Sequence, residues 1–151
     1  MSSLTFQFLQ ESDIPELKEM FIQYNPGDDR DEGYQFNPAQ VKKFLSQPQN
    51  VAFVAKLDGK IIGCVYGYTL TMIDEDEKEF MIYGVDIHPE YHNRGYGTEL
   101  MKYVLNWLKD NGYRDTWVYT GAENKAACRC YEKAGMVYSG DDARSYDMKF
   151  K

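Results

Sequence analysis

The stretch VDIHPEYHNRGYGT, residues 85–98, joins a predicted strand to a predicted helix. The strand covers residues 80–87, a run of apolar, aromatic and β-branched side chains. The helix follows because apolar side chains recur at three- and four-residue steps from Leu100 to Leu108. The chain therefore turns from strand to helix through a loop that carries Gly95 and Gly97.

This loop has the features of an anion site. The first N–H groups of a helix lack intrahelical partners and carry partial positive charge. Gly95 and Gly97 let the main chain approach an anion closely, and Arg94 adds a charge. Two glycines also occur in strand–helix turns that bind nothing. Because Leu100 replaces the third glycine of the dinucleotide fingerprint and no Gly-Lys-Ser/Thr follows, we expect a phosphate loop of another kind.

The loop resembles motif A of the GNAT N-acetyltransferase superfamily. In that family Arg/Gln-x-x-Gly-x-Gly/Ala follows a bulged strand, and the loop amides hold the pyrophosphate of acetyl-coenzyme A. Here His92 replaces the first Arg or Gln, and Arg94 could supply the missing charge. The resemblance implies a cofactor-binding role for seven residues: His92, Asn93, Arg94, Gly95, Tyr96, Gly97 and Thr98.

Size and composition predict one globular domain over residues 1–151, with 43% hydrophobic and 15% aromatic residues. No apolar run approaches the roughly 20 residues that span a membrane. No signal peptide is visible at the N-terminus, so we expect a cytoplasmic protein without a membrane partner. The net charge of −7 argues against nucleic acid as a partner and suits a cationic one, although acidity alone can serve solubility. The cysteine and histidine spacings predict neither a disulfide framework nor a metal site.

The order of predicted elements indicates an α/β fold, a mixed sheet with helices on both faces. The elements are strands at 5–9, 51–57, 60–72, 80–87 and 116–120, helices at 12–24, from Asn37 to before Pro48, from the glycine loop to Asn111 and at 124–134, and a closing hairpin at 136–138 and 145–150. This order also resembles the GNAT acyl-CoA N-acyltransferase fold. The resemblance implies a central, mostly antiparallel sheet that splays apart between strands 80–87 and 116–120.

Residues 121–136 resemble the family's motif B, whose ending commonly reads Tyr-Glu-Lys-x-Gly-Phe. Asn124 and Tyr131 share one helix face. By the resemblance, Asn124 contacts the cofactor arm, and main-chain groups of Val85 and Ile87 bond to pantetheine lying in the splay.

The resemblance also implies direct attack of an amine on the thioester. The amine must lose a proton, since its ordinary pKa is near ~10.4, and the leaving thiolate must gain one. Tyr131 would be the acid, although a tyrosine can equally be packed with its hydroxyl paired locally. Met81 and Tyr83 stand where many members carry a glutamate, so Glu79 or Asp86 acting through a water is the expected base. Asp86 could instead be a strand-end residue satisfied by backbone N–H groups.

Acidic loops suggest the acceptor. By the resemblance, three loops border the acceptor side; they carry Asp28, Asp29, Asp31 and Glu32; Asp74, Glu75, Asp76 and Glu77; and Asp141 and Asp142. Such runs are also typical of solvated loops. Residues 61–97 loosely resemble aminoglycoside 3-N-acetyltransferases, whose strand aspartate falls on Gly84.

We therefore predict an acetyl-CoA-dependent N-acetyltransferase acting on a primary amine of a small cationic acceptor, aminoglycoside- or polyamine-like. The alternatives are a non-catalytic coenzyme A-binding sensor or interaction module, and a protein or peptide N-acetyltransferase. Homodimers occur in the family, which leaves a homodimer open for this chain.

Overall fold

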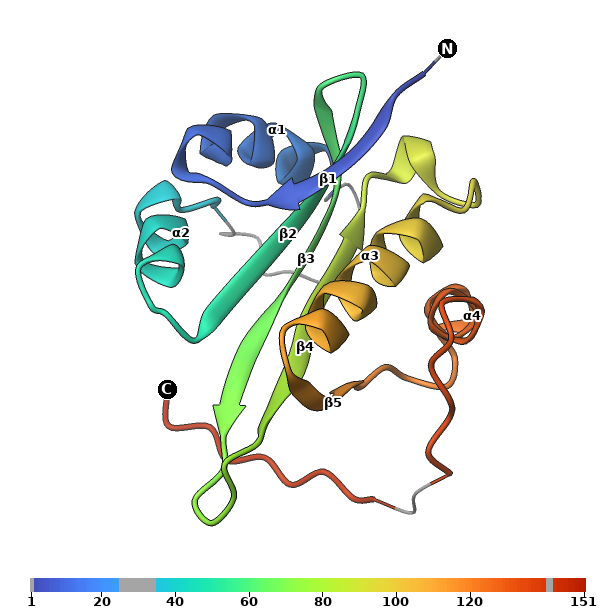
Figure 1. The fold of residues 1–151 in the computed structure, drawn as a ribbon. Helices are drawn as coiled ribbons and strands as arrows, with labels where there is room; N and C mark the ends of the chain where they lie inside the picture. The colour runs from blue at the N-terminus through green and yellow to red at the C-terminus, as the bar shows by residue number, and fades with distance from the viewer. Residues whose placement is uncertain (1, 25–34, 141–142) are drawn as a thin grey trace.

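Five strands form one sheet in the computed structural model, which describes residues 2–24, 35–140 and 143–151 (Figure 1). They lie in the order β1-β2-β3-β4-β5, with bounds Leu4–Phe8, Asn50–Leu57, Lys60–Thr71, Lys78–Ile87 and Tyr113–Val118. Neighbours from β1 to β4 are antiparallel, whereas β4 and β5 are parallel. The predicted mixed, mostly antiparallel sheet is confirmed.

The helices have the bounds α1 Ile14–Tyr24, α2 Pro38–Leu45, α3 Tyr96–Asp110 and α4 Lys125–Lys133, with 3₁₀ turns η1 Glu11–Asp13 and η2 Pro89–Tyr91. The α1 helix begins later than predicted, because Ser12 lies inside η1 rather than capping the helix. Gln10 is the N-cap of this turn, and the Asp13 carboxylate, at the turn's third residue, accepts a hydrogen bond from the Gln10 N–H at 2.9 Å. No helix in the described parts of the chain has the length and apolar content to span a bilayer.

Both faces of the sheet are buried, and alternate residues of β2 show why. Phe53 and Ala55 pack with Leu100 and Met101 of α3 on one face. Ala52 and Val54 face the other way, toward Leu17 and Met20 of α1. Because strand side chains alternate between faces, a continuous apolar strand needs helices on both sides.

A β-bulge interrupts β4 at Tyr83. Tyr66 of β3 pairs with Gly84 and Gly67 pairs with Ile82, so Tyr83 is an extra residue. A bulge bends its strand and increases the local twist. Pairing between β4 and β5 ends at Ile82 and Val118. Beyond this point β4 continues without β5, which confirms the predicted splay.

The predicted closing hairpin is wrong. Residues 135–140 and 143–151 form no strand, and the C-terminal segment runs as irregular chain in Figure 1. An alternating pattern forms a strand only when one face finds apolar surface to pack on. Here the side chains that would form the buried face remain exposed, including Val137 at 88% and Phe150 at 90%.

Candidate active site

The loop before α3 has a backbone that only certain residues adopt easily. Asn93 has φ 61° and Gly95, the N-cap of α3, has φ 83°. This left-handed region suits glycine best and asparagine next among ordinary residues. Gly95 brings no side chain to the end of α3, and a Cβ built there would meet no atom within 4 Å. The start of α3 is therefore an uncapped, accessible helix N-terminus, as an anion site requires.

Two histidines fix this loop to the end of β4. His92 Nε2 lies 2.6 Å from the Ile87 carbonyl oxygen, to which the ring donates in the tautomer protonated at Nε2. His88 is buried, and its main-chain N–H donates to the Ile62 carbonyl at 2.8 Å. The Nδ1 atom of His88 accepts from the Glu90 N–H at 3.1 Å. The loop is thus positioned by side chains that do not themselves need to touch a ligand.

A cavity of about 400 Å³ lies beside the N-terminus of α3. It runs from the free part of β4, past the loop, to one face of α4. Its lining contains all the residues predicted to bind the cofactor except Arg94: Val85, Ile87, His92, Asn93, Gly95, Tyr96, Gly97, Thr98, Asn124 and Tyr131. The fold therefore brings motif A and motif B together at one cavity, although they are about thirty residues apart in the sequence.

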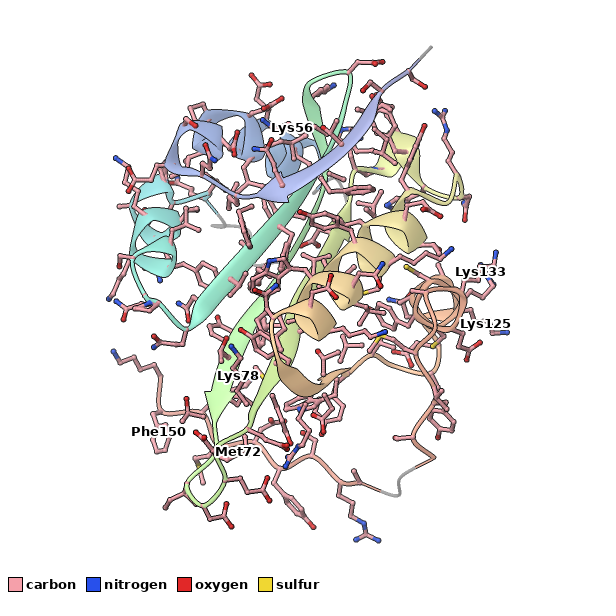
Figure 2. All side chains as sticks on the ribbon, in the orientation of Figure 1. Lys56, Met72, Lys78, Lys125, Lys133 and Phe150 are labelled. Atoms are coloured by element: carbon pink, nitrogen blue, oxygen red, sulfur yellow. The ribbon has the colours of Figure 1, made fainter. Side chains whose placement is uncertain are left out.

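The positive side chains of this smaller cavity come from α4. Arg129 and Lys133 line it, whereas Arg94 does not and instead lies over the Tyr91 ring, 5.7 Å from its centroid. Figure 2 shows Lys133 projecting from α4. Sequence reasoning missed both residues, although Arg129 and Lys133 are four apart and so share a helix face. Only the packing of α4 against α3 reveals that this face borders the loop.

A second cavity, of about 840 Å³, covers the sheet face beneath α1 and α2 and reaches the end of β5. Val85, Asn124 and Tyr131 line both cavities. The two cavities therefore adjoin at these three residues, next to the splay between β4 and β5.

Tyr131 is half-buried at this meeting point. Burial, followed by the charges of Cys130, Asp86 and Cys128, raises the pKa of Tyr131 to about 12. The phenol therefore keeps its proton at neutral pH and can serve as a donor. Asn124 is the N-cap of α4, and its Oδ1 accepts from the Ala127 N–H at 3.2 Å.

The structure separates the two predicted bases. Asp86 lines the larger cavity and is close enough to Tyr131 and Tyr66 for its charge to raise the pKa of each, after the larger effect of burial. Glu79 lies at the start of β4 and lines neither cavity. Its carboxylate is bonded to the Arg114 guanidinium. Hydrogen bonding to Glu79 raises the pKa of Arg114 above its ordinary value, although desolvation opposes this rise.

The acidic turn between β3 and β4 belongs to the same cluster. Glu75 is bonded to Arg114, and Glu77 lies 3.6 Å from it. Figure 1 places this turn at the end of the sheet opposite the start of α3. The acidic groups at 28–32 and 141–142 lie outside the described residues. Among the residues that are described, no group of three or more His, Cys, Asp or Glu side chains could hold a metal ion.

Comparison with known proteins adds the family. The model of the Acetyltransferase (GNAT) family matches residues 14–136, which is most of the chain. The chain belongs to this family. The matched region thus includes the loop before α3, the whole of α4, and the three residues that line both cavities.

Curated relatives agree with this assignment. The chain is 28% identical over 102 residues to an uncharacterized N-acetyltransferase of Mycobacterium tuberculosis, covering 68% of this chain and 62% of that protein. It is 32% identical over 85 residues to the mycothiol acetyltransferase of Streptomyces coelicolor, covering 56% of this chain and 26% of that protein. The GNAT chain thus spans less than two thirds of the length of these relatives.

Solved GNAT structures share the fold. An aminoglycoside acetyltransferase from an uncultured soil metagenomic sample, in complex with sisomicin, superposes with a TM-score of 0.83 at 18% identity, covering 97% of this chain and 96% of that one. An aminoglycoside N-acetyltransferase in complex with CoA gives a TM-score of 0.76 at 18% identity, covering 99% and 97%. At such identities the likeness speaks for the fold alone.

Proposed function

We propose that this GNAT protein transfers an acetyl group from acetyl-CoA to a primary amine by direct attack. The observation that carries the proposal is that the smaller cavity, at the start of α3, and the larger one share Val85, Asn124 and Tyr131 in their linings. This arrangement gives the cosubstrate and the amine separate spaces that meet at a single proton donor. Holding two reactants together in this way can contribute roughly 7–11 kcal/mol to lowering a barrier.

The residues of the smaller cavity suit the cosubstrate. The amides that begin α3 at Tyr96, Gly97 and Thr98 are the proposed ligands of the diphosphate, which gains from the helix dipole. Arg129 and Lys133 lie on the same cavity wall and supply positive charge for phosphate groups. Val85 and Ile87 line the same cavity along the free part of β4, where main-chain groups can bond to the pantetheine arm.

Asp86 and Tyr131 are the proposed base and acid. Asp86, directly or through a water, takes a proton from the amine, whose nitrogen then forms a bond to the thioester carbonyl carbon. The carbon–sulfur bond breaks, Tyr131 donates its proton to the departing sulfur, and the phenolate so formed takes the second proton from the acylated nitrogen. Its raised pKa supports this role because the acid must be protonated at the working pH. Glu79 has less support as the base, since Arg114 holds it outside both cavities.

The proposed acceptor is a small cationic amine. The larger cavity, of about 840 Å³, has the size of a small-molecule site. Asp86 provides negative charge on its wall. Amines of aminoglycoside and polyamine type both meet this description at the level of charge.

A thiol-release assay tests the proposal. Acetyl-CoA is mixed with the protein and a panel of primary amines, and the free coenzyme A thiol is measured with and without amine. Release should depend on an amine, and Asp86→Asn should lower kcat/KM by roughly 10²–10⁴-fold, the usual contribution of general base catalysis. Glu79→Gln should change kcat/KM by less than about 3-fold. If no amine raises release above the amine-free rate, the chain is a non-catalytic coenzyme A-binding module.

A further inference from the structure

We propose that the larger cavity selects amines that carry an aromatic body beside the ammonium group. This inference rests on the proposed function and replaces its aminoglycoside- or polyamine-like acceptor with an aromatic amine. Of the aromatic rings that line that cavity, four contact one another in a closed circuit: Phe44, Tyr66, Tyr68 and Tyr83. We call these four rings the aromatic box.

The ring geometry is that of a preformed site. Phe44 lies with its centroid 5.6 Å from those of Tyr66 and Tyr68, edge-to-face with both. Tyr83 closes the circuit at 6.0 Å from Tyr66 and 5.9 Å from Tyr68. These separations fall in the range where aromatic pairs attract each other. A ligand entering the aromatic box therefore meets rings that already support one another.

Three structural elements hold the rings in place. Tyr66 and Tyr68 are two residues apart on β3 and point to the same face, while Phe44 comes from α2. Tyr83 is the bulge residue of β4, and its side chain is 66% exposed. Gly84 lacks a Cβ where the Tyr66 ring lies, and a side chain there would overlap that ring. The bulge thus creates both the splay and the position of the fourth ring.

Charge suits the ammonium end of such an amine. Among the described residues that line this cavity, Asp86 is the only charged side chain. A carboxylate at this position can pair with an ammonium group, while the rings of the aromatic box contact the aromatic body.

The orientation of the amine follows. Tyr131 and Asp86 lie at the part of the cavity that meets the smaller one, and the aromatic box lies on the sheet face toward α2. The ammonium end of an acceptor would be directed toward Asp86 and Tyr131, with its aromatic body packed against the four rings.

Calorimetry on the protein saturated with coenzyme A tests this selection without turnover. The titrants are 2-phenylethylamine, n-butylamine and spermidine, and the proteins are wild type, Tyr83→Ala and Tyr146→Ala. Tyr83 and Tyr146 are both highly exposed, so neither truncation disturbs the core, but Tyr146 does not line the cavity. We expect 2-phenylethylamine to bind at least 10-fold more tightly than the other two amines. Tyr83→Ala should abolish this preference, and Tyr146→Ala should retain it.

Several results would overturn the inference: no binding of 2-phenylethylamine, spermidine bound as tightly as 2-phenylethylamine, or a Tyr83→Ala protein that keeps the preference. The thiol-release assay decides the proposed function separately. Selective binding of 2-phenylethylamine without acetyl transfer would contradict the proposed function and support the aromatic box. Acetyl transfer with a preference for spermidine would support the proposed function and contradict selection by the aromatic box.

Discussion

Tyr131 shows how one side chain can line two cavities. It lies on α4, yet its side chain lines both the cavity beside α3 and the cavity beneath α1 and α2. Burial contributes most to raising its pKa to about 12, because a phenolate is poorly solvated there. The same burial that positions the hydroxyl therefore also keeps it protonated, which is the state a general acid needs.

Tyr131→Phe removes the proton donor while preserving the ring. We expect kcat to fall by roughly 10²–10⁴-fold, the usual range for a general acid, with the affinity for acetyl-CoA nearly unchanged. The sign of the pKa shift adds a second expectation. Because a pKa of about 12 keeps Tyr131 protonated at every pH well below that value, deprotonation of this group should not lower wild-type kcat between about pH 7 and pH 10. An unchanged kcat in the variant would remove Tyr131 from the mechanism.

The residues of the site were predictable to different degrees. Gly95 could be predicted because a close backbone turn demands a particular residue type, and Asn124 because the segment that contains it resembles motif B. Arg129 and Lys133 could not, since nothing local distinguishes a cation facing a cavity from one facing solvent. Arg94 has the right chemistry in the right loop, but its guanidinium lies over Tyr91.

At the scale of elements, the bulge in β4 has the largest consequences. It places Tyr83 in the aromatic box, and pairing with β5 stops one residue before it. Gly67 and Gly84 flank the bulge on the two strands. A Cβ on Gly67 would overlap the Met81 carbonyl, and one on Gly84 would overlap the Tyr66 ring. Side chains are excluded on both sides of the irregularity.

Gly84→Ala should therefore destabilise the fold by about 1–3 kcal/mol, the usual cost of overpacking a tight site. Urea unfolding followed by circular dichroism measures this free energy. Gly121→Ala is the matched control, because the only close atoms there belong to the flexible and exposed side chain of Glu123. We expect the control to stay within about 0.5 kcal/mol of wild type. Equal stability of both variants would show that Tyr66 moves aside freely.

Most elements followed from local patterns, and one did not. The α3 helix and the tight connection between the strands at 51–57 and 60–72 were predictable because apolar periodicity and an Asp58-Gly59 pair leave clear signatures. In the structure these two residues have left-handed φ values of 51° and 82°. The closing hairpin was predicted on alternation alone, which cannot reveal whether a partner strand is within reach. The C-terminal segment therefore matches a strand in pattern while its apolar side chains stay exposed.

At the scale of the whole molecule, an ion pair joins the first strand, the turn η1 and the second strand. Lys56 of β2, labelled in Figure 2, reaches Asp13 at 2.9 Å. Gln7 of β1 donates to the same carboxylate at 3.3 Å. Burial raises the pKa of Asp13, but hydrogen bonds from Lys56, Gln10 and Gln7 together with the Lys56 charge outweigh it. The net pKa is below the ordinary value.

The direction of this shift sets the acid stability. A lowered folded-state pKa stabilises the fold above the unfolded pKa of about 3.9, and the contribution is lost as pH falls through the folded value. Asp13→Asn should cost about 1.5–3 kcal/mol at pH 7, the worth of hydrogen bonds to a charged group. The difference from wild type should shrink below about pH 4 in chemical denaturation. The exposed Asp147→Asn serves as the control, and a pH-independent difference for Asp13→Asn would contradict the assignment.

The fold class was predictable from the whole sequence because its two signals are independent. Alternating buried strands require helices on both faces, and the order of elements limits how the chain can connect them. From the sequence, the position of the two cavities next to each other could be predicted only through the family resemblance. It depends on contacts between segments distant in sequence, which no local pattern specifies.

The central claim is that the start of α3 grips the diphosphate of coenzyme A, and calorimetry on two glycine variants tests it most directly. Gly95 and Gly112 have φ values of 83° and 80°, and a Cβ at either meets no atom within 4 Å. Alanine therefore imposes similar backbone strain at both, but only Gly95 lines the smaller cavity. We predict saturable coenzyme A binding by wild type and Gly112→Ala, and binding weakened about 10-fold or more in Gly95→Ala. No saturable heat with wild type, or equal weakening in both variants, would contradict the account.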